Sequence, residues 1–422
     1  MPMQVSVPPV GNIRFIPLSY DPDESQTSTL RLVFALRPEW KGGKIEFIRF
    51  TDGITNTLLK VVNNIPGQTD QEIDTQAILL RAYGEGSDII IDREREAQNH
   101  EVLMHHKLAP QLLARFQNGM LYKFLRGNVT SPSDLQTRDV SLAVARRLGE
   151  WHAVLPCIPN PVENISTEAN GDQNAENRTL PTNGTKLDVQ DPAHNIVTGK
   201  LVPNIWTTMQ KWIHALPAET ILEKNRQETL RNEMNRLVPE LSNRPTLGVN
   251  GLVFAHCDLL SGNIIVEPRA EDKVDAPLSV NFIDYEYATP SPAAFDIANH
   301  FAEWGGLECD YSKLPTKTQR KEFIRQYISS YATHIQSGIS PIDQESEAAR
   351  LLEEVNMFRG IPGFYWGIWG LIQAKISRID FDYSSYAELR LCEYWDWRSE
   401  SDGSRAAQGR EIPLREARWA EE

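Results

Sequence analysis

Short alternating and apolar runs dominate the first third of the chain. KIEFIRF at 44–50 alternates apolar and polar residues, TDGITN supplies a turn, and TLLKVV at 57–62 resumes an apolar run. This order is typical of a β-hairpin. Further strands are expected at 76–84 and 120–125. A helix is expected at 91–107, where acidic residues come early and a lysine comes last.

From about residue 200 onward the pattern changes to helical spacing. Six helices are expected, over 205–216, 219–241, 317–337, 344–359, 364–379 and 384–397. A β-rich amino-terminal third followed by a mainly helical remainder indicates an α+β enzyme with two lobes and a cleft between them.

Two segments lack these patterns. Residues 159–201 are rich in Asn, Thr, Pro, Gly and Asp and nearly free of aromatic residues. Such a segment cannot bury enough apolar area to offset its chain entropy, so we predict a disordered insertion. Its three Asn-x-Ser/Thr triplets are expected by chance in an Asn-rich segment. The segment 399–422 is also polar, and we expect a mobile tail.

Composition and charge exclude several classes of protein. The 422 residues carry 43 Lys and Arg against 57 Asp and Glu, a net charge of −14. This balance argues against a nucleic-acid partner, which would need clustered cations. The longest apolar run, 364–372, is about half the length of a membrane span, so no transmembrane segment is expected. Four scattered cysteines and no visible secretory signal favour a cytoplasmic protein.

Candidate chemistry appears in the sequence VFAHCDLLSGNIIV. His256, Asp258 and Asn263 give H-x-D-x-x-x-x-N between two apolar strands, which we expect to form a short hairpin. In kinase catalytic loops the Asp accepts the proton of the attacking hydroxyl, and the Asn holds a metal ion. Asp and Asn are also common turn residues, so the pattern alone leaves a structural role equally open.

A second acidic residue favours the catalytic interpretation of this loop over a purely structural one. The apolar strand in SVNFIDYEY ends at Asp284, 21 positions after Asn263. This is the order and position of the metal-binding Asp in the kinase D-F-G segment. Two acids and an amide with kinase spacing argue against a role as loop caps alone.

The amino-terminal strands supply weaker signals for phosphoryl transfer. The turn before the strand at 57–62 could lie over phosphates, although it is not GxGxxG. Arg81 lies in ILLRAY where a protein kinase carries Lys, and Glu96 lies on the helix that follows. Arg is not a neutral replacement for Lys. A surface Arg–Glu pair is an equal alternative.

Taken in order, these segments resemble the choline/ethanolamine kinase family, which is related to aminoglycoside phosphotransferases and distantly to protein kinases. The resemblance covers most of 44–398 and rests on DGITNTLLKV, ILLRAYG, LAPQLLARFQNGMLYKFL, HCDLLSGNIIV, FIDYEYATPSPAAFDIANHFAEW and WGIWGLIQAKISRIDFDYSSY. In that family the third strand carries Arg, so Arg81 fits.

The resemblance implies an α+β, protein-kinase-like (aminoglycoside-phosphotransferase-like) fold of two lobes. It implies an N-terminal extension at 1–40, a nucleotide-binding N-lobe at 41–125, and a catalytic and substrate-binding C-lobe at 126–398, followed by the tail at 399–422.

Family roles can be carried over residue by residue. Asp258 would be the catalytic base, and Asn263 and Asp284 would hold Mg²⁺. The residues expected to contact ATP are Gly53, Ile54, Thr55, Asn56 and Thr57 over the phosphates, Arg81 paired with Glu96, and the backbone of Lys123 and Leu125 at the adenine edge.

Two positions depart from common family spellings. Cys257 stands where Asn is frequent, which should leave the chemistry intact. The sequence ATPSPAAFD replaces a more aromatic stretch after Tyr287, which puts the shape of the substrate-pocket rim in question.

The substrate side has an aromatic signal of its own. Trp366 and Trp369 share a face of a predicted helix, and Phe381, Tyr383 and Tyr386 follow. Aromatic faces attract cations, although a Trp stripe at helical spacing is more often core packing. The resemblance places these residues around a substrate ammonium group, together with Tyr287 and the carboxylate of Glu303.

The expected partners are therefore ATP and a small cationic amino alcohol, with a homodimer also considered. HCDLL, DGITN and SRIDFDY look more like ethanolamine kinases than choline kinases. The expected reaction is phosphorylation of ethanolamine, the first step of the CDP-ethanolamine route to phosphatidylethanolamine, with choline as the alternative substrate. A non-catalytic kinase-like scaffold and an aminoglycoside phosphotransferase are less favoured.

Overall fold

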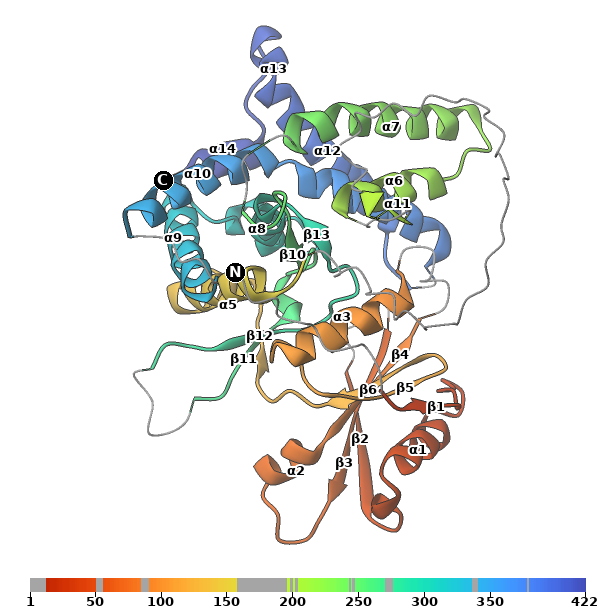
Figure 1. Ribbon diagram of the computed structural model, residues 1–422. Helices are drawn as coiled ribbons and strands as arrows, with labels where there is room; N and C mark the ends of the chain where they lie inside the picture. Colours follow the sequence, from red (N-terminus) through yellow and green to blue (C-terminus); the bar gives the residue numbers. More distant parts are fainter. Residues whose placement is uncertain are drawn as a thin grey trace, which may run out of the picture.

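The N-lobe is a twisted sheet of six strands (Figure 1). The computed structural model describes residues 13–50, 56–84, 91–157, 204–242, 244, 247–269, 276–335, 341–377 and 379–422, and the backbone of 196–197 and 200–201. The strands are β1 Phe15–Ile16, β2 Lys44–Phe50, β3 Asn56–Asn64, β4 Ile78–Tyr83, β5 Leu112–Phe116 and β6 Gly119–Lys123, in the order β1-β5-β6-β4-β3-β2. The predicted hairpin is β2–β3, with Phe50 opposite Leu58.

The two faces of this sheet have different neighbours. Helix α1 (Ser25–Leu36) places Leu32 and Val33 in one core with Leu59 and Leu80, on one face. Because side chains alternate along a strand, Arg81 of β4 lies on the opposite face. That face looks toward the helical lobe, so the sheet presents Arg81 to the cleft between the lobes.

The sequence did not predict how the chain enters this lobe. The segment called an N-terminal extension is part of the N-lobe from residue 13 onward, because β1 pairs in parallel with β5 and α1 covers the sheet.

The strand expected at 76–84 begins only at Ile78. Before it lies helix α2 (Asp70–Gln76), which begins with a capping box between Thr69 and Glu72.

The C-lobe is mainly helical. Its elements, with helix α3 between the lobes, are α3 Arg93–His105, α4 Pro132–Leu135, α5 Arg138–Val154, α6 Ile205–Ala215, α7 Ile221–Ser242, α8 Ala293–Ala302, α9 Lys317–His334, α10 Pro341–Phe358, α11 Ile361–Ile376, α12 Tyr383–Ser401, α13 Ser404–Ala407 and α14 Leu414–Ala420. All six helices expected after residue 200 are present. Helices α5 and α8 were not predicted. All ten residues of α8 are buried, including its polar residues Asp296, Asn299 and His300.

The catalytic sequence does not form the expected hairpin. Strand β10 (Val253–Ala255) pairs with β13 (Thr289–Ser291), whereas β11 (Ile264–Val266) pairs with β12 (Val280–Phe282) and β7 (Asn128–Val129). The two flanking strands therefore belong to separate small sheets. The loop between them spans the gap, which places Asp258 at the edge of both.

The segment expected to be a mobile tail is helical and packed. Trp419 of α14 is 5% exposed, and its indole nitrogen donates to Asn356 Oδ1 at 2.9 Å. The guanidinium of Arg320 lies 4.0 Å from the centre of its ring. Glu416 is buried and forms an ion pair with Arg359 at 2.8 Å. The prediction of a mobile tail was wrong because Glu416 is neutralised by Arg359 and Trp419 is buried against Arg320.

The insertion predicted at 159–201 lies outside the described residues, except for the backbone of β8 (Ile196–Val197) and β9 (Lys200–Leu201), which pair with each other. Its disorder stays a prediction. Within the part of the chain that the structure describes, no helix is both long and apolar enough to cross a membrane.

Candidate active site

The loop that carries Asp258 is held by its backbone. The N–H groups of His256 and Cys257 donate to the two carboxylate oxygens of Asp296, at 2.9 and 2.8 Å. Cys257 has a φ of 64°, a left-handed conformation that few side chains adopt. Asn263 donates from its amide nitrogen to Asp258, at 2.8 Å to the carbonyl and 3.2 Å to the carboxylate. The structure therefore brings the predicted base and amide together.

Asp258 is surrounded by other acids. Its side chain is buried, and burial raises the pKa of its carboxyl group well above the ordinary value; the charges of Asp284, Glu303 and Glu286 raise it further, whereas the bond from Asn263 lowers it. A carboxylate in this setting is a stronger base than one in water.

Asn263 and Asp284 fit the metal site that the resemblance implies. The amide nitrogen of Asn263 faces Asp258, which leaves its oxygen for another partner. Asp284 has a φ of 65°, and its carboxylate is 28% exposed. Hard oxygens of one or two side chains, completed by phosphates and water, are the ligands that Mg²⁺ prefers. No cluster of three His, Cys, Asp or Glu side chains suited to a metal occurs among the described residues.

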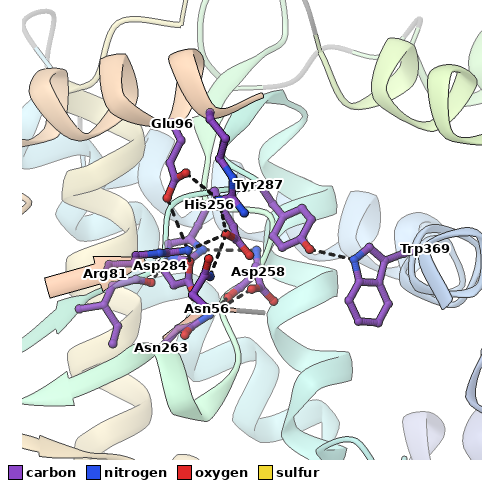
Figure 2. A network of polar contacts seen from close by, with 12 residues as sticks. Asn56, Arg81, Glu96, His256, Asp258, Asn263, Asp284, Tyr287 and Trp369 are labelled. Atoms are coloured by element: carbon purple, nitrogen blue, oxygen red, sulfur yellow. Dashed lines mark hydrogen bonds and ion pairs between the residues drawn. The ribbon is translucent and has the colours of Figure 1, made fainter. Parts of the chain in front are cut away.

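Arg81 is the centre of an ion-pair network that Figure 2 shows from close by. Its Nη2 lies 3.4 Å from Glu96, 2.6 Å from Asp284 and 2.5 Å from Glu286. Arg81 and Glu96 are buried, so the alternative of a surface pair is wrong. Burial alone would lower the pKa of Arg81, but the three carboxylates raise it well above its ordinary value. The cation thus stays charged beside the expected phosphate position.

Sequence reasoning missed two residues of this network. Glu286 accepts from Arg81, from Arg93 at 3.0 Å and from Asn56 at 3.3 Å. Arg93 also reaches Glu96 at 2.8 Å. The sequence did contain a signal for Glu286. It is the second acid of Asp284-Tyr285-Glu286, at the position where the kinase D-F-G segment has glycine. Glu286 links β3, β4 and α3 to the C-lobe.

The predicted nucleotide contacts are only partly visible. Gly53, Ile54 and Thr55 lie outside the described residues, whereas Asn56 and Thr57 begin β3. At the opposite end of the sheet, the N–H of Lys123 donates to Gln111 O at 2.9 Å. The Lys123 N–H is therefore already bonded within the protein. Its carbonyl is the backbone group that would contact the adenine edge. The roles of Lys123 and Leu125 stay predictions.

The predicted aromatic residues gather into one cluster. The rings of Trp366 and Trp369 lie 5.4 Å apart at 90°, and Trp369 donates from its indole nitrogen to Tyr287 Oη at 2.8 Å (Figure 2). Tyr383 and Tyr386 lie 5.7 and 6.3 Å from Trp369. Phe381 contacts both tyrosines, at 4.8 and 5.8 Å. Rings from α11, α12 and the segment after β12 therefore converge beside Asp258.

Glu303 is buried but already has a cationic partner. Arg390 of α12, which is 1% exposed, donates to its Oε1 at 2.7 Å. Burial raises the pKa of Glu303, although Arg390 opposes the shift. The sequence did not single out Arg390, which sits four residues after Tyr386 and so shares its face of the helix. Any ammonium group that meets Glu303 must share its carboxylate with this guanidinium.

The chain matches the choline/ethanolamine kinase family model over residues 47–395. It belongs to this family. A probable ethanolamine kinase of Nematostella vectensis is 32% identical over 89% of this chain and 94% of its own length. Human ethanolamine kinase 2 is 31% identical over 92% of this chain and 85% of its own. Family membership confirms the prediction of a small-molecule kinase that uses ATP.

Solved structures support the same fold. An ethanolamine kinase of Plasmodium vivax aligns with a TM-score of 0.61 at 23% identity, covering 89% of each chain. A choline kinase of Cryptosporidium parvum aligns with a TM-score of 0.60 at 20% identity, over 91% of this chain and 97% of its own. The predicted two-lobed kinase-like fold is confirmed.

Both departures from the choline/ethanolamine kinase spellings lie beneath the site. Cys257 is fully buried, and burial raises the pKa of its thiol well above the ordinary value, so it is a poor nucleophile. The stretch ATPSPAAFD forms β13 and the start of α8, and Thr289–Ser291 is buried against β10. It supports the catalytic loop rather than the pocket rim.

Proposed function

We propose that this protein is an ethanolamine kinase, which transfers the γ-phosphoryl group of ATP to the hydroxyl of ethanolamine. The observation that carries the proposal is one cleft holding Asp258, Asn263 and Asp284 next to a cluster of aromatic rings. Its ethanolamine kinase relatives support the choice of amino alcohol. The product, phosphoethanolamine, would open the CDP-ethanolamine route.

Asp258 is proposed to act on the substrate hydroxyl. It orients the O–H, and its carboxylate takes the proton as the oxygen bonds to the γ-phosphorus and the bond to the β-phosphate oxygen breaks. Asn263 fixes the carboxylate by its hydrogen bond. The raised pKa of Asp258 favours uptake of this proton at the moment of transfer.

The phosphates are proposed to lie between Arg81 and the catalytic loop. Arg81 offers fixed donors there because Glu96 and Glu286 hold its guanidinium. Asn263 and Asp284 would hold Mg²⁺, which when bound would neutralise negative charge on the phosphates. Asp284 would then divide its carboxylate between the metal and Arg81.

The ammonium group of the substrate is proposed to rest against Trp366, Trp369, Tyr383 and Tyr386. Each aromatic face contributes about 0.5–2 kcal/mol of attraction, depending on exposure to water. A primary ammonium also has three N–H donors that need acceptors, whereas a trimethylammonium has none. Glu303 and the oxygen of Tyr287 are the nearest proposed acceptors. Choline is therefore the second candidate substrate, since the rings alone would suit it.

One assay tests the proposal. Purified protein with ATP and Mg²⁺ is given ethanolamine, choline or an aminoglycoside, and ADP release is followed. We expect the highest kcat/KM for ethanolamine and a lower one for choline. Preference for choline would make it a choline kinase, and turnover of the aminoglycoside alone would overturn both proposals. The cytoplasmic location and the homodimer stay predictions, to be checked by cell fractionation and sedimentation.

A further inference from the structure

Asn299 lies between the catalytic loop and the aromatic cluster. It sits on α8 and is fully buried. Its amide nitrogen donates to the carbonyl of Cys257 at 3.0 Å, and its amide oxygen accepts from the indole nitrogen of Trp366 at 2.8 Å. One side chain therefore bonds to both halves of the proposed site.

The residues at the two ends of this link belong to the proposed chemistry. Cys257 directly precedes Asp258 in the chain, so its carbonyl helps to set where that carboxylate points. The ring centre of Trp366 lies 5.6 Å from that of Tyr287 and 5.4 Å from that of Trp369. All three belong to the cluster proposed to hold the ammonium group. Through its two hydrogen bonds, Asn299 connects the loop of the proposed base, Asp258, to Trp366 of the proposed ammonium site.

The same helix holds the loop from its other side. Asp296, three residues earlier, accepts from the N–H of Cys257 at 2.8 Å. Both backbone polar groups of Cys257 are thus fixed by α8, at a residue with a φ of 64°. Because that backbone conformation is unfavourable for cysteine, the loop depends on these bonds to keep its geometry.

A simpler reading is that Asn299 only satisfies the buried indole of Trp366. That reading accounts only for the amide oxygen of Asn299. Its amide nitrogen bonds at the same time to the carbonyl of Cys257, next to the proposed base, at 3.0 Å.

We propose that Asn299 is a positioning residue that couples the ammonium contact to the catalytic base. A cation bound against Trp366 fixes the orientation of the indole. The hydrogen bond to Asn299 then fixes the Asn299 amide, whose second bond holds the Cys257 carbonyl and so the position of Asp258. The inference rests on the proposed amino alcohol kinase activity. It assigns to Asn299 an effect on turnover that exceeds its effect on nucleotide binding.

Two variants separate the two bonds. Trp366→Phe keeps an aromatic face but removes the N–H that donates to Asn299, along with part of the ring. Asn299→Ala removes both bonds and leaves the Cys257 carbonyl and the indole unpaired. Asn118→Ala is the matched control, because Asn118 also donates and accepts one bond each with Tyr20, at 2.9 Å, in the turn between β5 and β6.

Steady-state kinetics with ethanolamine and ATP give the readout. We expect Trp366→Phe to lower kcat about 2- to 10-fold and Asn299→Ala about 10- to 100-fold, with the KM for ATP unchanged. The double variant should be no slower than Asn299→Ala, because both changes break one connection. Asn118→Ala should keep the kcat of the wild type.

Three results would overturn the coupling. They are a wild-type kcat in Trp366→Phe, multiplied losses in the double variant, or an equal loss in Asn118→Ala. A wild-type protein that phosphorylates neither ethanolamine nor choline would instead remove the proposed function, and this inference with it.

Discussion

Asp258 is one of several carboxylates crowded into a small part of the cleft. Among the described residues, Asp284, Glu286 and Glu96 pair with the cations Arg81 and Arg93. The charges of Asp284 and Glu286 also help to raise the pKa of Asp258. This excess of negative charge is unfavourable in a buried place unless a cation offsets it. A nucleotide bound with its metal ion would bring a cation that these carboxylates can contact.

Replacing Asp258 tests its role directly. Asp258→Asn keeps the shape but removes the proton acceptor, so we expect kcat to fall about 10²- to 10⁴-fold. The melting temperature should not fall, because the change removes a buried charge. Asp284→Ala should also abolish turnover at saturating Mg²⁺. The exposed carboxylate variant Glu388→Gln is the control, and near-normal turnover in either active-site variant would contradict the mechanism.

Buried histidines predict how stability depends on pH. Burial lowers the pKa of His100, His256 and His300 from 6.5 to about 4. In His300 burial lowers the pKa, although the bond to Leu259 O opposes the shift. The neutral ring has both nitrogens paired, since Nδ1–H donates to Leu259 O and Nε2 accepts from the indole nitrogen of Trp304.

In the unfolded chain these histidines gain a proton below about pH 6.5, whereas in the folded protein they stay neutral until about pH 4. Stability is therefore complete above pH 6.5 and is lost as the pH falls from there toward 4, by up to about 1.4 kcal/mol per pH unit for each histidine. Denaturant midpoints measured between pH 7.5 and 5 check this. The exposed variant His214→Gln should leave the slope unchanged.

Helix α14 shows how a short polar element can become part of the core. Its buried large apolar residue, Trp419, contacts Arg320 of α9 and, with 6.3 Å between the ring centres, Phe301 of α8. The N–H of Lys317 at the start of α9 donates to Glu421 O. The carboxy-terminal segment thus ties α9 to the helix that supports the catalytic loop.

We expect Trp419→Ala to cost about 3–5 kcal/mol of the free energy of unfolding, the usual range for a buried Trp. Leu414→Ala, in the same helix, should cost little, because Leu414 is 78% exposed. Chemical denaturation of both variants gives the comparison. Equal, small losses in both would mean that α14 does not contribute to the core.

At the scale of the whole molecule, the apolar residues form two large cores. One lies between α1 and the sheet, and the other fills the C-lobe. Helix α3 contributes Leu103 to the C-lobe core, and its Asn99 donates to Ala288 O at 3.0 Å. Figure 1 shows α3 lying across the boundary between the lobes. It bonds to both lobes, because Arg95 donates to Thr289 at 3.0 Å while Glu94 pairs with Arg115 of β5 at 2.7 Å.

Because Leu80 and Leu103 belong to different cores, their amides should respond differently in hydrogen exchange. Leu32→Ala opens a cavity in the N-lobe core and should reduce the protection of amides in β3 and β4, such as Leu80, but not that of Leu103. Leu148→Ala in the C-lobe core should reduce the protection of Leu103. A shared loss of protection at Leu80 and Leu103 in both variants would show a single cooperative unit.

Local pattern was enough for some elements and not for others. The β2–β3 hairpin and the later helices follow from alternation and helical spacing, and the spacing of Asp258, Asn263 and Asp284 indicated a kinase site. Helix α8 was not predicted, although Asp296, Asn299 and His300 recur at helical spacing; these polar residues are buried and bond to the catalytic loop. Arg390 and Asn299 have roles that depend on long-range contacts with Glu303 and Trp366, which no local pattern records.

All ten residues of α8, Ala293–Ala302, are buried. This has a consequence for how the sequence can change over time. A larger side chain at its alanines has no room to enter, and a smaller one at Phe295 or Phe301 leaves a cavity. Its polar residues each have a specific partner in or near the catalytic loop. A complete scan of substitutions should therefore find here an unbroken run of intolerant positions, longer than the catalytic motif itself.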